Sequence, residues 1–212
     1  YDNLNDSSYK LKHTAYAALV NKTAVCQGYA LLFYRIMLEL GIDCRLIPGM
    51  TEGGAHGWNI VKLNGLYYNV DSTWDAGYDE YIWFLNSFWD FGGHERDMEY
   101  DTIAFHNKYP IAAESYEKGV TGTKDPYIYA GYAGAETTNV VWYLGRDGSI
   151  TFKGEGDMYD FNSRDQQPYY GYWEDEITKV VVEEGITSLG KYSFYKFSAL
   201  EEAVIPSGVI EI

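Results

Sequence analysis

Three residues in the N-terminal half of the 212-residue chain have side chains that could act together in catalysis. Cys26 offers a thiol that can attack a carbonyl carbon. His56 and Asp71 lie near the two ends of one short stretch, AHGWNIVKLNGLYYNVDSTW (residues 55–74). A cysteine, a histidine and a carboxylate are the nucleophile, the base and the orienting group of cysteine-dependent acyl transfer. The remaining question is whether the fold brings the three together.

The segment after Cys26 has the pattern of a helix. Residues 26–40 contain no Pro, carry apolar side chains at helical spacing, and are followed by Gly41 as a stop signal. A shorter helix is predicted over residues 10–20, and residues 42–49 are predicted to form a strand that ends in a Pro-Gly turn. Cys26 would then stand in a first helical turn, where free N–H groups and partial positive charge stabilise a thiolate. The Cys26 N–H is also one candidate donor to an oxyanion.

Two other fates of Cys26 compete with catalysis. The thiol could be buried and inert, as free cysteines commonly are, or it could form a disulfide with Cys44. A helix over residues 26–40 would be about 21 Å long, and the four residues beyond it return only about 13 Å. Since a disulfide needs Cα atoms closer than about 7 Å, the helix excludes the bridge.

His56 and Asp71 are expected to meet on a β-hairpin. Two strand-like runs, 56–63 and 66–73, are joined by Asn64-Gly65, the strongest short hairpin signal. A two-residue turn sets Leu63 opposite Leu66, so that His56 and Asp71 become diagonal neighbours on one face, with Cβ atoms about 7 Å apart or less. A carboxylate on one ring nitrogen fixes the tautomer of the imidazole and leaves the other nitrogen free to act as a base. The alternative is a purely structural His–Asp pair.

The two faces of this hairpin are expected to differ. Trp58 shares the face of His56, where it could shield the catalytic pair from water, form a wall for the substrate, or simply pack. The opposite face is expected to be the core face and carries Val61, Leu63, Tyr68, Val70 and Trp74.

The order of these motifs resembles the transglutaminase-like core family. The match lies in AVCQGYALLFYRIMLELGIDCRLIPG (24–49) and AHGWNIVKLNGLYYNVDSTWD (55–75), and the resemblance covers roughly residues 1–100. It implies an α+β, papain-like core in which a helix with an N-terminal Cys packs on an antiparallel sheet. It also implies that Cys26, His56 and Asp71 are the catalytic triad, acting on a protein or peptide substrate as a transglutaminase or a cysteine peptidase. We predict no cofactor, and the sequence leaves any calcium requirement open.

The C-terminal part contains a second hairpin, predicted over residues 140–154, and then an internal repeat. ITKVVVEEGITSL from Ile177 and LEEAVIPSGVIEI from Leu200 align at an offset of 23 residues, within the leucine-rich-repeat range. The repeat is similar to the BspA-type leucine-rich repeats of bacterial surface proteins. That resemblance implies a secreted or surface-attached bacterial protein. Because such repeats need neighbours to bury their faces, the array is expected to continue past Ile212. The predicted organisation is a cysteine domain (1–110), a connector (111–138), a β-rich lead-in (139–176) and about one and a half repeats (177–212).

Composition argues against several classes of partner. The net charge is −15, with 16 Lys and Arg against 31 Asp and Glu, so binding to nucleic acid or to an anionic membrane is not expected. No apolar run approaches membrane-spanning length. His94, in GGHERD, is near carboxylates, but the spacing matches no known metal site. We therefore predict no metal and assign His94 a surface or structural role.

A non-catalytic function is the alternative to the enzyme. The chain contains 22 Tyr residues. In that interpretation the repeats and a tyrosine-rich surface bind a host or cell-surface protein or glycan. The cysteine domain would then be a relic. Fast alkylation of Cys26 at mildly acidic pH would favour the enzyme, whereas an ordinary thiol would favour the adhesin.

Overall fold

The structure is a computed structural model that describes residues 9–171 and 173–210. It divides into two compact units, which are described separately. Unit 1 comprises residues 1–100 and 109–125, and unit 2 comprises residues 101–108 and 126–212. The first unit combines helices with an antiparallel sheet, so the predicted α+β class is confirmed.

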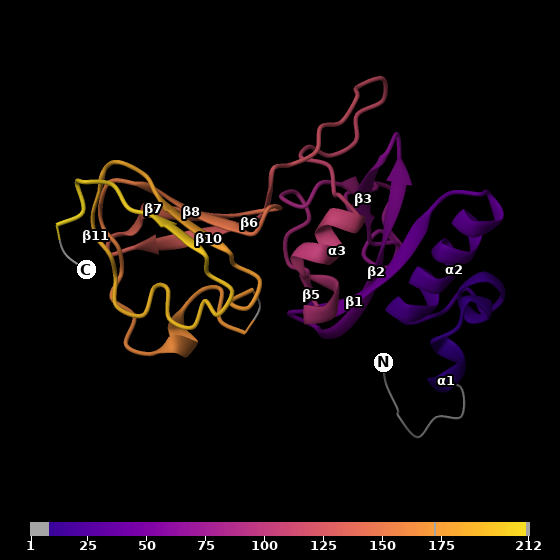
Figure 1. The fold of residues 1–212 in the computed structure, drawn as a ribbon. Helices are drawn as coiled ribbons and strands as arrows, with labels where there is room; N and C mark the ends of the chain where they lie inside the picture. Colours follow the sequence, from indigo (N-terminus) through magenta and orange to yellow (C-terminus); the bar gives the residue numbers. More distant parts are fainter. Residues whose placement is uncertain (1–8, 172, 211–212) are drawn as a thin grey trace. The chain divides into compact units, whose positions relative to one another are not determined.

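Unit 1 is built on a five-stranded sheet with the order β4-β3-β2-β1-β5 (Figure 1). The strands are β1 (Cys44–Thr51), β2 (Gly54–Leu63), β3 (Leu66–Val70), β4 (Phe84–Asn86) and β5 (Glu95–Arg96). The predicted hairpin register is confirmed, because Leu63 pairs with Leu66 and Asn59 pairs with Val70. Asn64 and Gly65 have φ angles of 51° and 93°, the left-handed pair that a tight hairpin turn needs.

The predicted Pro-Gly turn at the end of the first strand is wrong. Pro48 and Gly49 lie inside β1, where they pair with Gly57 and His56 of β2. The turn comes later, at residues 52–53. The side of β1 that faces β5 is paired only at Gly49 and Met50, so the missing N–H of Pro48 interrupts no ladder there.

The predicted helix after Cys26 is confirmed as α2 (Cys26–Glu39). The predicted helix over residues 10–20 is split into α1 (Tyr9–Lys12) and a π-helical turn, η1 (Ala17–Asn21). Thr14 lies at the break, where its hydroxyl donates to the Leu11 carbonyl at 2.7 Å and accepts from the Ala17 N–H at 3.3 Å. Such local side-chain bonds compete with the helical ladder.

Helix α2 packs on one face of the sheet, and the other face is covered as well. On the α2 side, Phe33 and Met37 pack against buried Cys44, Val61 and Val70. On the His56 side, Trp58 and Ile60 are 1% and 0% exposed, so this face is buried as well as the predicted core face. The aromatic segment after β3 folds back over this face and brings the Phe91 ring within 6.2 Å of Trp58.

Unit 2 contains a second five-stranded sheet with the order β12-β10-β8-β7-β6. Its strands are β6 (Tyr127–Gly134), β7 (Thr137–Gly145), β8 (Ser149–Gly154), β10 (Lys179–Val182) and β12 (Glu202–Val204), and β9 (Gly156–Asp157) pairs with β11 (Ile186–Ser188). The predicted second hairpin is confirmed as β7–β8. Strands β8, β10 and β12 run parallel, and Lys179 pairs with Glu202, which reproduces the sequence offset of the repeat.

Short helical segments complete the two units. They are η2 (Met98–Tyr100) in unit 1, and α3 (Ile103–Lys108) and η3 (Arg164–Gln166) in unit 2. The segment predicted as a connector is divided, because residues 111–125 lie in unit 1 and β6 joins the sheet of unit 2.

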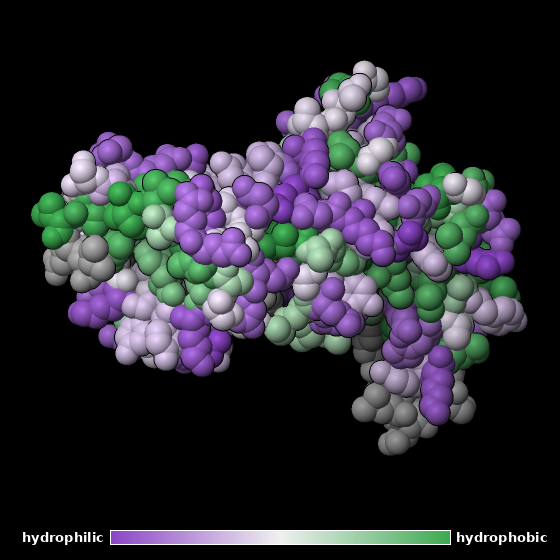
Figure 2. Space-filling model, viewed as in Figure 1, coloured by the Kyte–Doolittle hydropathy of each residue, from purple (hydrophilic) through white to green (hydrophobic). Residues whose placement is uncertain are grey.

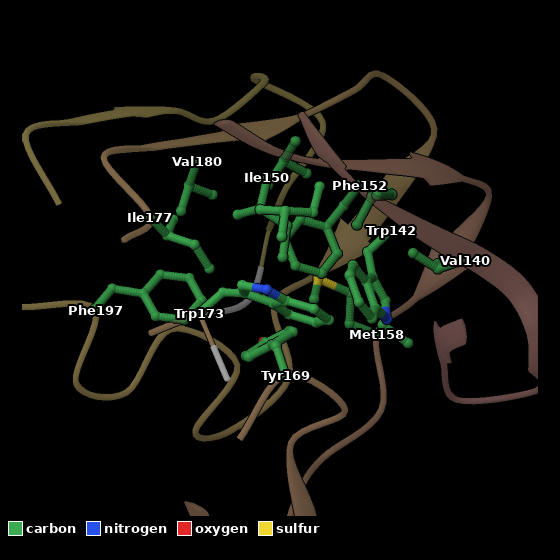
Figure 3. Packing of buried hydrophobic residues seen from close by; sticks show 14 of the residues in the cluster. Val140, Trp142, Ile150, Phe152, Met158, Tyr169, Trp173, Ile177, Val180 and Phe197 are labelled. Carbon is green, nitrogen blue, oxygen red and sulfur yellow. The ribbon is translucent and has the colours of Figure 1, made fainter. Parts of the chain in front are cut away.

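The core of unit 2 lies between this sheet and the returning loops (Figure 3). Trp142, Ile150 and Phe152 from β7 and β8 are at most 1% exposed, and Tyr169 and Ile177 from the loops are fully buried against the same cluster. Figure 2 shows hydrophobic surface at the end of this unit where the described chain stops, and Val204 and Ile210 are 42% and 87% exposed. Across the described residues, no helix is long and apolar enough to cross a membrane.

Candidate active site

Cys26 opens helix α2 and is held there by packing on the preceding segment. The N–H of buried Val25 donates to the Lys12 carbonyl at 3.1 Å. At Gly28 a Cβ atom would lie only 2.7 Å from the Lys12 oxygen and 3.0 Å from the Thr14 oxygen, so only glycine permits this close approach. Cys26 itself is half-buried, and both cysteines are free, which confirms that no Cys26–Cys44 bridge forms.

The surroundings of Cys26 favour its thiolate. Burial raises the pKa of the Cys26 thiol. The interaction with His56 and the positive charge of its ring lower this pKa, and so do the backbone N–H groups of Gln27 and Gly57. The net effect is a lowered pKa. Gln27 lies in the first helical turn, where N–H groups have no partner within the helix. Cys44 behaves in the opposite way, because burial raises its pKa to about 12.

His56 links the thiol to a buried carboxylate. Its Nε2 atom lies 2.7 Å from Asp71 Oδ2, which leaves Nδ1 for Cys26. Burial lowers the pKa of His56, yet the bonds to Asp71 and Cys26 and their charges raise it to about 9. The lowered pKa of Cys26 and the raised pKa of His56 both favour a thiolate–imidazolium pair.

Asp71 is placed by the end of β3 and by the turn that follows. Its side chain is 0% exposed. Its Oδ1 atom accepts from the Thr73 N–H at 2.8 Å and the Trp74 N–H at 3.2 Å. Burial raises the carboxyl pKa, but the hydrogen bonds from His56 and His94 outweigh it and hold this pKa well below its usual value. Asp71 is thus ionised and fully occupied as an acceptor.

The structure adds His94, to which the sequence assigned only a surface or structural role. Its side chain is 1% exposed, and its Nε2 atom lies 3.0 Å from Asp71 Oδ2, the oxygen that also binds His56. His94 precedes β5, which pairs with β1, whereas Asp71 follows β3. No spacing rule reports this approach, because the irregular segment between β3 and β5 creates it.

Aromatic rings enclose the two imidazoles. Trp58 lies 6.2 Å from His56 and 5.0 Å from His94, measured between ring centroids. It is 1% exposed, so it forms a wall behind the imidazoles, and its predicted contact with a substrate stays a prediction. Trp74, assigned to the core face, instead lies 5.7 Å from His56, because β3 ends at Val70 and the strand alternation stops there.

The site offers donors for a metal ion, although its distances describe hydrogen bonds. His56, Asp71 and His94 present ligand atoms within 4.8 Å of one another. Both imidazoles, however, direct Nε2 at Asp71 Oδ2 at 2.7 and 3.0 Å, the separations of charge-assisted N–H···O bonds. A metal would have to replace both of those protons, so the hydrogen-bonded chain accounts for the geometry without an ion.

An apolar pocket of about 360 Å³ is lined by Val70 and Ser72, the residues on either side of Asp71 in the sequence. Its lining comes from α2, the end of β3, the following turn and β4. The lining residues are Phe33, Val70, Ser72, Asp75, Ala76, Tyr81 and Phe84. Tyr81 and Phe84 are 76% and 46% exposed, so the rim of this pocket is aromatic and accessible.

The N-terminal part of the chain is similar to known proteins. Residues 1–72 match the family model described as the transglutaminase-like superfamily. The kyphoscoliosis peptidases of Homo sapiens and Mus musculus are each 38% identical over 64 residues, covering 24% of this chain and 10% of theirs. The chain therefore spans about a tenth of the length of these curated relatives.

Two solved structures are similar to about a third of the chain. A leucine-rich repeat protein from Eubacterium ventriosum is 27% identical, covering 38% of this chain and 21% of that one, at a TM-score of 0.35. A structure described as a TGase is 24% identical, covering 34% of this chain and 18% of that one, at a TM-score of 0.29.

Proposed function

We propose that the chain catalyses cysteine-dependent acyl transfer on protein or peptide substrates, because residues 1–72 match the family model described as the transglutaminase-like superfamily. The observation that carries the proposal is the position of His56, whose Nε2 atom lies 2.7 Å from Asp71 Oδ2 and whose pKa is coupled to that of Cys26. Nucleophile, base and orienting acid are thus available at one site.

In the proposed reaction, the Cys26 thiolate attacks a carbonyl carbon of a glutamine side-chain amide or of a peptide bond. The carbonyl oxygen becomes an oxyanion, for which the Cys26 N–H at the start of α2 is a donor. The C–N bond then breaks, and the departing nitrogen takes the proton of His56 and leaves as ammonia or as an amine. A thioester with Cys26 remains. Asp71 keeps the imidazole oriented throughout.

The second half-reaction decides the type of enzyme. Neutral His56 takes a proton from an amine, which gives an isopeptide product, or from water, which gives hydrolysis. Either attack releases Cys26 and restores the ion pair with His56. Because the same residues serve both routes, the relative access of amine and water to the thioester separates a transglutaminase from a peptidase.

The direct test supplies a protein substrate with and without a labelled primary amine to the wild type and to Cys26→Ala. Label incorporation by the wild type alone indicates transamidation, and new peptide termini indicate peptidase activity. Cys44→Ala is the matched control, because its buried thiol has a pKa of about 12 and should leave both activities unchanged. A wild type that does neither with a broad peptide library would count against acyl transfer.

We propose that unit 2 contributes a binding surface for a protein or glycan partner. Exposed tyrosines support this: Tyr132 is 59% exposed, and Tyr192 and Tyr195 are 46% and 47% exposed. Aromatic side chains with polar tips are common at protein interfaces. The bacterial surface location implied by the repeat resemblance belongs to the same proposal. Substituting Tyr192 and Tyr195 with Ser should weaken adhesion to cells without changing Cys26 reactivity.

A further inference from the structure

His94 touches two groups that can only accept hydrogen bonds. Its Nε2 atom lies 3.0 Å from Asp71 Oδ2, and its Nδ1 atom lies 3.1 Å from the Gly92 carbonyl oxygen. A carbonyl oxygen has no proton to give, and Asp71 is ionised because its pKa is lowered. A neutral imidazole carries a single N–H and could satisfy one of these acceptors. With a proton on each ring nitrogen, His94 would donate to both acceptors and carry a positive charge.

The site then becomes a chain of four alternating charges. The order is the thiolate of Cys26, the imidazolium of His56, the carboxylate of Asp71 and the imidazolium of His94. Hydrogen bonds join the last three groups, and the pKa of Cys26 is coupled to His56. The side chains of His56, Asp71 and His94 are 7%, 0% and 1% exposed. A carboxylate removed from water this completely needs compensating donors. Two cations on one oxygen provide them, and the four formal charges cancel.

The rings around His94 suit a cation. Phe91 stacks on it with centroids 3.9 Å apart, and Trp74 and Trp83 lie at 4.2 and 5.4 Å. Aromatic faces attract cations within about 6 Å of the ring centroid. They also exclude water and prevent the imidazole from turning away from Asp71.

We propose that His94 is a positioning residue of the acyl-transfer site, which holds Asp71 in place and, by sharing its charge, keeps His56 acidic enough to protonate the departing amine. This inference rests on the proposed function. A carboxylate that served His56 alone would hold the His56 proton more tightly. The second cation reduces that hold, so removing it should make His56 a weaker acid.

The size of the effect follows from the separation of the two imidazoles. Their centroids lie 5.7 Å apart. At an effective dielectric constant near 20, repulsion between two unit charges at that distance displaces a titration by about two pH units, and solvent screening reduces this to about one. Among the described residues, the titratable groups shown against the His94 ring are Asp71 and His56, and the other contacts are the Gly92 carbonyl and aromatic rings. Arg96, two residues on, directs its Nη2 to Asn69 instead.

The test is a nitrogen-15 NMR titration of the histidine rings in the full chain. In the wild type at neutral pH, both His94 nitrogens should show the shifts of N–H groups. In His94→Gln and His94→Phe, the His56 midpoint should move upward by about one pH unit. The matched control is His106→Gln, because His106 also bonds a buried carboxylate, Asp101 at 2.7 Å, but lies in unit 2. This control should leave His56 unchanged.

Three results would overturn the proposal. The first is one bare ring nitrogen on His94 in the wild type, a measurement that needs no variant to fold. The second is an unchanged His56 midpoint in both folded variants. The third is stoichiometric binding of Zn²⁺ alone that displaces the ring protons of His56 and His94, which would make the cluster a metal site.

Amine incorporation and peptide cleavage are measured separately on the same proteins, so the two proposals can fail independently. A wild type with the coupled titration but no acyl transfer would refute only the enzymatic function. An active wild type whose His56 titration and pH–rate profile are unchanged in the His94 variants would refute only the role of His94.

Discussion

Replacing Asp71 with Asn tests the proposed ion pair most directly. The substitution keeps the size of the side chain but leaves one oxygen to serve two histidine N–H groups and two backbone N–H groups. The carboxamide NH₂ group of Asn would also face N–H groups that now donate to Asp71, so that donors would lie against donors. His56 loses its largest source of stabilisation as a cation, while its burial persists.

The expected magnitude follows from the pKa of His56, which the site raises from 6.5 to about 9. That rise corresponds to about 3 kcal/mol of preference for the charged ring. In Asp71→Asn, burial should hold the pKa of His56 at or below its ordinary value, so the thiolate–imidazolium pair collapses at neutral pH. Cys26 should then behave as an ordinary thiol with a pKa of about 8.5, which is ionised to only about 0.3% at pH 6. Alkylation at pH 6 should slow by about 100-fold.

The assay measures the rate of carboxamidomethylation of Cys26 by iodoacetamide between pH 4 and 10, followed by mass spectrometry. The wild type should react over a plateau that begins at mildly acidic pH, and Asp71→Asn should show a single rise near pH 8.5. Asp101→Asn is the matched control, because Asp101 also accepts from a buried histidine, in unit 2. A plateau that survives in Asp71→Asn would refute the reasoning.

Stability should show the same linkage. The raised pKa of His56 means that its contribution is complete below pH 6.5 and is lost as the pH rises toward 9. The lowered pKa of Asp71 means that its contribution is present above pH 3.8 and is lost on acidification. The stability difference between the wild type and Asp71→Asn should therefore be largest between about pH 4 and 6.5, and it is measured by urea unfolding.

Three further outcomes follow from the structure. In the folded wild type at pH 6, mass spectrometry should find iodoacetamide on Cys26 and none on Cys44, because burial raises the pKa of Cys44 to about 12; equal labelling would contradict the contrast. Gly65→Ala, at φ 93°, should cost about 1 kcal/mol and lower the melting temperature by about 2–4 °C, whereas Gly53→Ala, outside the left-handed region, should change it little. Ile150→Ala should cost about 2–5 kcal/mol in urea unfolding, because its fully buried side chain lies in the core of unit 2; a cost below 1 kcal/mol would contradict that packing.

Local sequence patterns determined the helix and the hairpin that carry the three candidate catalytic residues. The apolar spacing after Cys26 specified α2, and the Asn64-Gly65 pair specified the hairpin register, because turn geometry leaves one pairing that keeps the apolar residues on their faces. Those two elements already place a thiol at a helix N-terminus and a histidine diagonal to an aspartate. The sequence also determined the 23-residue offset of the repeat, which the pairing of Lys179 with Glu202 reproduces.

Only the tertiary structure decided what surrounds those residues. The segment between β3 and β5 has no periodicity, so its path over the sheet depends on where its aromatic rings can be buried. That path covers the hairpin face that carries His56, brings the Trp74 ring to 5.7 Å from His56, and brings His94 to Asp71. Sequence spacing records what is near along a strand or a helix, whereas a contact made by an irregular loop is chosen by packing.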